Sequence, residues 1–260
     1  MRTFTKFIGA CCCYGQKKDG VQFGPKLIFK HMKKHSEVNF IENFENNGYY
    51  KLFNIHQKYL QDGWKPVTVG GDHSISLATV ASSAKKFKED LTVVWVDAHA
   101  DINTYASSET KNLHGMPLAC LLGHDNMYNL PEIKPEQIIY IGLRDVDKYE
   151  AKIIKDLNIE NYTMEDLETQ PLTDILDNIK NKSDKIHLSF DVDSLDPRVI
   201  SNTGTPVPGG LSFSYGKKII EELSPQIVSA DLVEFNPMLT NKDIYEKELL
   251  KVISLLELLD

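Results

Sequence analysis

One short stretch constrains the fold of this chain more than any other. Residues 91–96 (Leu-Thr-Val-Val-Trp-Val) form a nearly continuous apolar run, typical of a strand buried on both faces of a parallel sheet. The run stops abruptly at three polar side chains, Asp97, His99 and Asp101. Carboxylates that leave a buried strand are costly unless they are paired or bound to a cation. Because ligands of open α/β sheets bind beyond the carboxyl ends of the strands, the stretch predicts a functional site there.

The same pattern recurs along the chain, where apolar runs of strand length alternate with segments of helical periodicity about eight times. The runs lie around Phe7 and Ile8 and at 38–41, 66–69, 91–96, 137–143, 159–162, 185–190 and 227–233. This alternation predicts a three-layer α/β/α sandwich with a mainly parallel sheet of about eight strands. A closed barrel uses the same alternation, and periodicity alone does not exclude it. Since no linker or repeat interrupts the pattern, residues 1–260 are expected to form one catalytic domain.

Composition narrows the possible functions and compartments. A net charge of −8 argues against a general nucleic-acid binder, and no stretch approaches the roughly 20 apolar residues of a membrane span. The four cysteines, at positions 11–13 and 120, form no CxxC motif and no disulfide framework. A reducing, cytoplasmic setting is therefore expected.

Polar side chains follow five of the expected strands. They are His73, the Asp97–His99–Asp101 group, the segment 144–147, the Asp191–Asp193 pair and Glu234. In a parallel sheet these strand ends share one rim, where four aspartates and two histidines would meet. That ligand set is too large for one tetrahedral zinc ion and suits two metal ions bridged by carboxylates.

The ligand types also indicate the metal and the reaction. Oxygen-rich ligation with one imidazole per metal suits Mn²⁺ and, less exclusively, Zn²⁺, Co²⁺ or Fe²⁺. Two such ions lower the pKa of a bridging water and produce hydroxide near neutral pH, which predicts hydrolysis at an electrophilic carbon or phosphorus. The sequence lacks the glycine-rich cradles of nucleotide sites, and the charge of Glu234 favours a cationic substrate group.

Three motifs resemble the signatures of the ureohydrolases, and the chain is similar to arginases over nearly its whole length. The motifs are Gly-Gly-Asp-His-Ser at 70–74, Asp-Ala-His-Ala-Asp-Ile-Asn at 97–103 and Ser-Phe-Asp-Val-Asp-Ser-Leu-Asp-Pro at 189–197. The resemblance implies two Mn²⁺ ions per chain. One would be held by His73, Asp97, Asp101 and Asp191, and the other by His99, Asp97, Asp191 and Asp193.

The resemblance also implies an activity, the hydrolysis of L-arginine to L-ornithine and urea by a hydroxide that bridges the two metal ions. Asp101 would hold that hydroxide and pass its proton to the leaving amine, and His114 would shuttle protons. Glu234 would pair with the guanidinium group of the substrate, and Thr205 would line the same pocket.

Further residues resemble those with which arginases bind the amino-acid end of the substrate. Asn103, Thr110 and Asn112 would bind the α-carboxylate, Asp147 the α-ammonium, and Glu150 would assist through water. Thr110 stands where arginases usually have serine and can still donate a hydroxyl. Lys111 stands where they usually have glycine, and it could either reinforce carboxylate binding or obstruct access.

Three alternatives to an arginase are open. The chain could hydrolyse agmatine or guanidinobutyrate, although Asn103 and Asp147 argue for arginine. It could be a single-zinc deacetylase of the same broad fold, although such sites lose ligands that are present here. It could also be a non-catalytic scaffold, because fold does not guarantee function. The family resemblance further implies a homo-oligomer, commonly a trimer or a hexamer, with a monomer or a dimer as the alternative.

Overall fold

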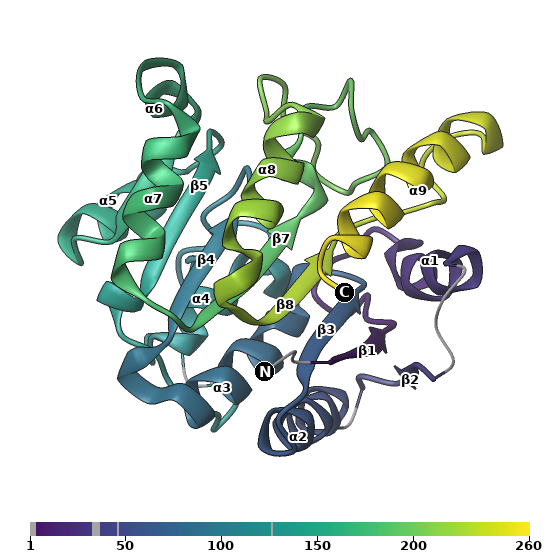
Figure 1. The fold of residues 1–260 in the computed structure, drawn as a ribbon, viewed down its shortest axis with the longest axis horizontal. Helices are drawn as coiled ribbons and strands as arrows, with labels where there is room; N and C mark the ends of the chain where they lie inside the picture. Colours follow the sequence, from purple (N-terminus) through teal and green to yellow (C-terminus); the bar gives the residue numbers. More distant parts are fainter. Residues whose placement is uncertain (1–3, 33–36, 46, 126) are drawn as a thin grey trace.

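Eight parallel strands form one open sheet at the centre of the molecule (Figure 1). The computed structural model describes residues 4–32, 37–45, 47–125 and 127–260. The strands are β1 (Thr5–Ala10), β2 (Asn39–Ile41), β3 (Lys65–Gly70), β4 (Thr92–Val96), β5 (Ile138–Leu143), β6 (Glu160–Thr163), β7 (Ile186–Asp191) and β8 (Ile227–Val233). Their order across the sheet is β2-β1-β3-β8-β7-β4-β5-β6. Because β2 and β6 are edges, the closed barrel is ruled out and the predicted sandwich is confirmed.

Helices cover both faces of the sheet. They are α1 (Gly24–His31), α2 (Gly48–Gln61), α3 (Ser76–Phe87), α4 (Pro117–Leu121), α5 (Lys148–Asp156), α6 (Met164–Thr169), α7 (Leu172–Lys182), α8 (Phe213–Leu223) and α9 (Lys242–Glu257). Side chains from α1, α6, α7, α8 and α9 pack in one core cluster, and those from α2, α3, α4 and α5 pack in another. None of the helices in the described ranges is long and apolar enough to cross a membrane.

The central strand β4 shows why the apolar runs are continuous. Val94 and Val96 point into one core cluster, while Val93 and Trp95 point into the other. All of β4 is buried, because helices cover the sheet on both sides. The runs at 38–41, 66–69, 91–96, 137–143, 159–162, 185–190 and 227–233 match strands to within one residue at either end. The short helix α6, capped by the Thr163 hydroxyl, was not predicted.

The strand order explains how one site is assembled from distant parts of the chain. The five strands that end in polar side chains, β3, β8, β7, β4 and β5, are consecutive neighbours in the sheet. All run in the same direction, so their carboxyl ends lie side by side on one rim. The rim therefore brings together side chains that lie up to 161 positions apart, such as His73 and Glu234.

Candidate active site

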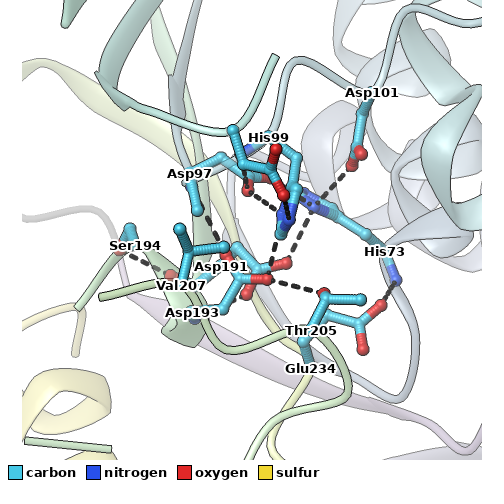
Figure 2. A network of polar contacts seen from close by, with 12 residues as sticks. His73, Asp97, His99, Asp101, Asp191, Asp193, Ser194, Thr205, Val207 and Glu234 are labelled. Atoms are coloured by element: carbon cyan, nitrogen blue, oxygen red, sulfur yellow. Dashed lines mark hydrogen bonds and ion pairs between the residues drawn. The ribbon is translucent and has the colours of Figure 1, made fainter. Parts of the chain in front are cut away.

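The inner part of the rim is a buried cluster around His73. The Nδ1 atom of His73 lies 3.0 Å from Asp97 Oδ2, 3.1 Å from Asp101 Oδ2 and 3.2 Å from Asp191 Oδ2. Figure 2 shows these side chains converging. Within the described part of the chain this buried Nδ1 makes no hydrogen bond. A nitrogen and three carboxylate oxygens that surround one point without a hydrogen bond are a donor set that fits a cation.

A second cluster lies beside the first and shares Asp97 with it. His99 Nδ1 lies 3.4 Å from Asp97 Oδ1 and 3.2 Å from Asp193 Oδ2. Two groups of donor atoms have the spacing of metal ligands, one formed by His73, Asp97 and Asp191 and the other by Asp97, His99 and Asp193. The six side chains expected to hold metal thus lie together, and their arrangement fits a pair of ions.

The backbone around the clusters explains the local sequence. A Cβ atom on Gly71 would lie 1.8 Å from the carbonyl oxygen of Cys12, so only glycine fits where β1 and β3 end side by side. Asp101 and Glu234 have φ angles of 51° and 68°. Such left-handed conformations are uncommon in residues with a side chain, and they concentrate at functional sites.

Trp95 belongs to the site, which sequence reasoning missed. Its ring stacks on His73, with centroids 4.1 Å apart and an interplanar angle of 11°. Its Nε1–H donates to Asp97 Oδ2 at 3.0 Å. Trp95 therefore orients two of the expected ligands. Its position in a strand that ends in those ligands was the available sequence signal, but its apolar neighbours indicated only a core residue.

Glu234 lies beside the inner cluster and contacts it directly. Its Oε1 accepts the backbone N–H of His73 at 2.9 Å and lies 3.0 Å from His114 Nδ1. Its Oε2 accepts from Gln16 Nε2 at 2.7 Å. Gln16 was also missed from sequence, since it lies in a polar loop without a motif. The carboxylate of Glu234 is only 1% exposed, and hydrogen bonds in such a low-dielectric interior are stronger than in water.

The electrostatics of His114 and Glu234 are coupled. Burial disfavours a charge on His114, but its hydrogen bond to Glu234 and the negative charge there outweigh burial and raise the pKa of His114 to about 9. Burial alone would raise the pKa of Glu234, and the same hydrogen bond lowers it below its usual value. At neutral pH the pair is an imidazolium and a carboxylate.

The carboxylates around the two histidines bind protons as well as cations. Burial and the charge of Asp97 raise the pKa of Asp101 to about 6. Burial opposes charge on His99, yet Asp193 and Asp97 raise the pKa of this imidazole well above its usual range. A metal ion that binds here must therefore displace protons.

The outer part of the rim carries the residues expected to bind the amino-acid end of the substrate. Asn103 Nδ2 donates to Asp147 Oδ2 at 2.7 Å. Oδ1 of Asp147 accepts from the first turn of α5, which holds its side chain in place. Glu150 accepts from the backbone of Asp147 and Ile102 at 3.2 and 3.3 Å, and burial raises its pKa to about 7.

The loop between Asn103 and Asn112 places Thr110 and Lys111 at the surface. The Thr110 hydroxyl accepts from the backbone of Asn112 at 3.2 Å. Lys111 has a φ of 59°, the conformation for which glycine is the usual residue. Its Nζ donates to the Tyr105 carbonyl at 2.5 Å and lies 5.0 Å from the centre of the Tyr105 ring. Lys111 therefore holds its own loop, and these contacts support neither role considered for it from sequence.

A second loop, which follows Asp193, is fixed by Arg144. The Arg144 guanidinium donates to the carbonyls of Asp193 at 2.7 Å and Val207 at 2.8 Å, and to that of Ser194 at 3.2 Å. The Thr205 hydroxyl in this loop donates to Asp193 Oδ2 at 3.0 Å, as Figure 2 shows. Arg144 thus positions Thr205 against the second cluster. His187, in contrast, is a core residue as expected: it belongs to β7, is fully buried and lies 2.8 Å from Ser229 Oγ of β8.

Comparisons with known proteins agree with this geometry. The Arginase family matches residues 5–255. The mitochondrial arginase-2 of Homo sapiens is 36% identical over 91% of this chain and 78% of its own length. The crystal structure of Bacillus subtilis arginase superimposes with a TM-score of 0.89 at 34% identity, covering 99% of this chain and 98% of that one.

A further solved structure is that of Entamoeba histolytica arginase in complex with L-ornithine. It superimposes with a TM-score of 0.88 at 34% identity and covers 98% of each chain. The match therefore extends over sequence and fold, and it covers 98% of each of the two solved arginase chains and 78% of the human relative. On this basis the chain belongs to the arginase family, a family of hydrolases.

Proposed function

We propose that this protein hydrolyses L-arginine to L-ornithine and urea with two Mn²⁺ ions. One observation carries the proposal. The rim that holds two clusters of metal-ligand geometry also carries, at its outer end, the hydrogen-bonded pair of Asn103 and Asp147. The first feature suits hydrolysis, and the second suits a substrate with charged α-groups. The L-ornithine found with the Entamoeba histolytica arginase supports the same substrate class.

Six side chains would hold the metals. His73, Asp97, Asp101 and Asp191 would bind one ion, and His99, Asp97, Asp191 and Asp193 the other. The unpartnered Nδ1 of His73 and the predominance of carboxylate oxygens favour a dication such as Mn²⁺. Two bound dications lower the pKa of water and so supply a hydroxide nucleophile near neutral pH.

The guanidinium group of the substrate would be oriented by Glu234 and Thr205. Glu234 is a buried carboxylate within reach of both the inner cluster and His114, so it can pair with a planar cation and aim its carbon at the metal centre. Thr205 lies against Asp193 and would close the other side of the pocket. Pairing with Glu234 also discriminates against neutral substrates.

The protons would be handled by Asp101 and His114. Asp101 has a pKa raised to about 6, so it can accept a proton at neutral pH and return it to the leaving amine. The side chain of His114 is 16% exposed and carries a proton at neutral pH, so it can exchange protons between the site and solvent. The carbon–nitrogen bond breaks as the amine receives its proton, which leaves urea.

The α-groups of arginine would be bound at the outer end. Asp147 would take the α-ammonium, with Glu150 assisting through water. The α-carboxylate would be bound by Asn103, Thr110 and Asn112. Agmatine has neither α-group, so its binding would leave these polar side chains without a substrate partner and would be disfavoured.

Three broader properties are also proposed: one domain, a reducing compartment and a homo-oligomeric assembly. The continuous sheet supports one catalytic domain, and the four free cysteines suit a reducing, cytoplasmic setting. Family likeness supports a homo-oligomer, a trimer or a hexamer, which sedimentation analysis would test.

The proposed function is tested by measuring products and metal together. The Mn²⁺-loaded protein is given L-arginine, and ornithine, urea and bound metal are measured before and after chelation. We expect urea and ornithine in equal amounts, two metal ions per chain and loss of turnover after chelation. Two bound ions without turnover would instead favour the non-catalytic scaffold.

A further inference from the structure

A line of buried hydrogen bonds connects Nε2 of His73 with the carboxylate of Asp231. His73 Nε2 lies 2.9 Å from Ser189 Oγ, and Ser189 Oγ lies 3.1 Å from Ser76 Oγ. Ser76 Oγ donates to Asp231 Oδ2 at 3.0 Å. All four side chains are at most 1% exposed, so water does not compete for these bonds. The line starts at the ring nitrogen that does not face the carboxylate cluster.

The acidic end of the line fixes the direction of every bond in it. A carboxylate only accepts hydrogen bonds, so the single hydroxyl proton of Ser76 is used on Asp231. Ser76 can then only accept from Ser189, whose proton is used in turn. Ser189 can only accept from His73, and the proton of a neutral His73 ring must sit on Nε2. Nδ1 is thereby left with its lone pair directed at the carboxylate cluster.

Asp231 is held as a carboxylate by more than Ser76. The Thr79 hydroxyl donates to the same oxygen, Oδ2, at 2.6 Å, and His187 Nε2 lies 3.0 Å from it. Three donors around one oxygen favour the ionised form and fix its orientation. The direction of the line is therefore set by a rigid, buried anion.

We propose that Asp231 and Ser76 are positioning residues that select the tautomer of His73 able to bind metal. The inference rests on the proposed function, in which His73 is a ligand. Neither residue touches the carboxylate cluster or the expected position of the substrate. The role is specific to the inner cluster, because no comparable buried line backs His99 in the described part of the chain. His99 Nε2 faces only Asp145, 3.7 Å away, whose side chain is 67% exposed.

The variant Ser76→Ala removes the middle of the line. The Ser189 hydroxyl would then be free to donate to Nε2, so the His73 proton could move to Nδ1, the atom that must face the metal. Loss of an outer partner of a metal-binding histidine typically costs about 10–100-fold in affinity. We expect this loss of Mn²⁺ affinity at the metal position beside His73 and little change at the position beside His99.

The matched control is Ser83→Ala. Ser76 and Ser83 are both fully buried serines of α3, but Ser83 Oγ contacts His187 Nδ1 and Ser229 Oγ at 3.0 and 2.8 Å, so it lies beyond Asp231 and not between Asp231 and His73. Both variants lose one buried hydroxyl, so a general loss of stability should affect them alike. Thermal unfolding of both variants shows whether they do.

The experiment measures Mn²⁺ binding by equilibrium dialysis, together with the electron paramagnetic resonance spectrum of the bound ions. The wild-type protein and Ser83→Ala should bind two ions and show the spectrum of a coupled pair. Ser76→Ala should bind one ion tightly and the second about 10–100-fold more weakly, with a mononuclear spectrum at limiting Mn²⁺. Asp231→Asn, of nearly the same shape, can present an amide N–H to Ser76 and should change in the same direction.

Two results would overturn the inference. One is wild-type affinity for two ions in both Ser76→Ala and Asp231→Asn. The other is an equal loss of Mn²⁺ affinity in Ser76→Ala and Ser83→Ala. If the wild-type protein itself failed to bind a pair of ions, the proposed function would be wrong, so the two failures are distinguishable.

Discussion

The two halves of the site are built on different principles. The inner half, comprising His73, Asp191 and Glu234, is almost completely buried, and these groups contact one another or other buried residues. The outer half, comprising Asn103, Thr110 and Asp147, is partly or largely exposed, and its polar groups are held by loops and by the start of α5. The difference suggests a division in which the inner half performs the chemistry and the outer half selects the substrate.

The largest effect should come from Asp97, which belongs to both groups of donor atoms that have the spacing of metal ligands. Asp97→Asn removes a charge that each metal ion needs, so we expect loss of the metal pair and a fall in kcat/KM for arginine well beyond 100-fold, the upper range for an outer partner of a ligand. Metal analysis and urea release would measure it. Asp62→Asn, an exposed carboxylate at the end of α2, is the control and should have a far smaller effect.

Glu234→Gln tests the inner half without disturbing the metals. The amide keeps the shape and an accepting oxygen, but it removes the buried charge that would pair with guanidinium. Losing one partner of a buried charged pair costs about 2–5 kcal/mol, so kcat/KM should fall roughly 30- to 5,000-fold. Two bound ions should remain. A Glu234→Gln enzyme with wild-type kinetics would remove Glu234 from substrate binding, and Glu109→Gln on the exposed loop serves as control.

Metal affinity should fall with decreasing pH. The raised pKa values of His73, His99 and Asp101, the last about 6, mean that the metal-free site holds protons that the ions displace. The free site therefore binds more protons than the loaded site, and affinity must increase with pH. For each displaced proton we expect about a tenfold loss of Mn²⁺ affinity for every unit by which the pH falls, measured by Mn²⁺ titration between pH 6 and 8. Affinity that did not vary with pH would contradict this assignment.

Asp147→Asn probes the outer half. Asparagine can still cap α5, so the change mainly removes a negative charge. Hydrogen bonds to charged groups contribute about 1.5–3 kcal/mol, so KM for arginine should rise roughly 10–100-fold while kcat/KM for agmatine stays nearly constant. Equal losses for both substrates would show that Asp147 acts on the fold of the rim instead of on the α-ammonium.

The smallest effect should come from Lys111. Lys111→Gly places glycine at a left-handed backbone position that disfavours a side chain, which stabilises the loop. It also removes the contact of Nζ with Tyr105, which destabilises the loop, so the two effects oppose each other. We expect KM for arginine to change by no more than about threefold, corresponding to less than 1 kcal/mol. Lys111→Met separates charge from backbone strain. A tenfold change in KM in both variants would mean that the lysine charge contacts the substrate.

The inner half could largely be predicted from sequence. Asp97, His99 and Asp191 follow buried apolar runs, and the cost of burying charge makes a cation the simplest explanation. The parallel order of the strands then places them together. Trp95 could not be assigned, because a buried indole that packs on His73 has the same sequence pattern as one that packs in the core.

The outer half was harder to predict for a physical reason. Loops such as 103–112 carry no periodicity, so the direction of Lys111 and the partner of Asn103 depend on tertiary contacts. Gln16 and Arg144 act through hydrogen bonds across long sequence separations, as between Gln16 and Glu234 and between Arg144 and Val207. The line from His73 to Asp231 likewise depends on side chains from α3, β7 and β8 that no motif joins.

The most direct test of the central claim is the ratio of kcat/KM for L-arginine to that for agmatine, measured by urea release from the Mn²⁺-loaded protein. The division into a catalytic inner half and a selective outer half predicts a ratio far above one, with Asp147→Asn lowering it. A ratio near or below one would keep the hydrolytic inner half but contradict the assignment of this protein as an arginine hydrolase.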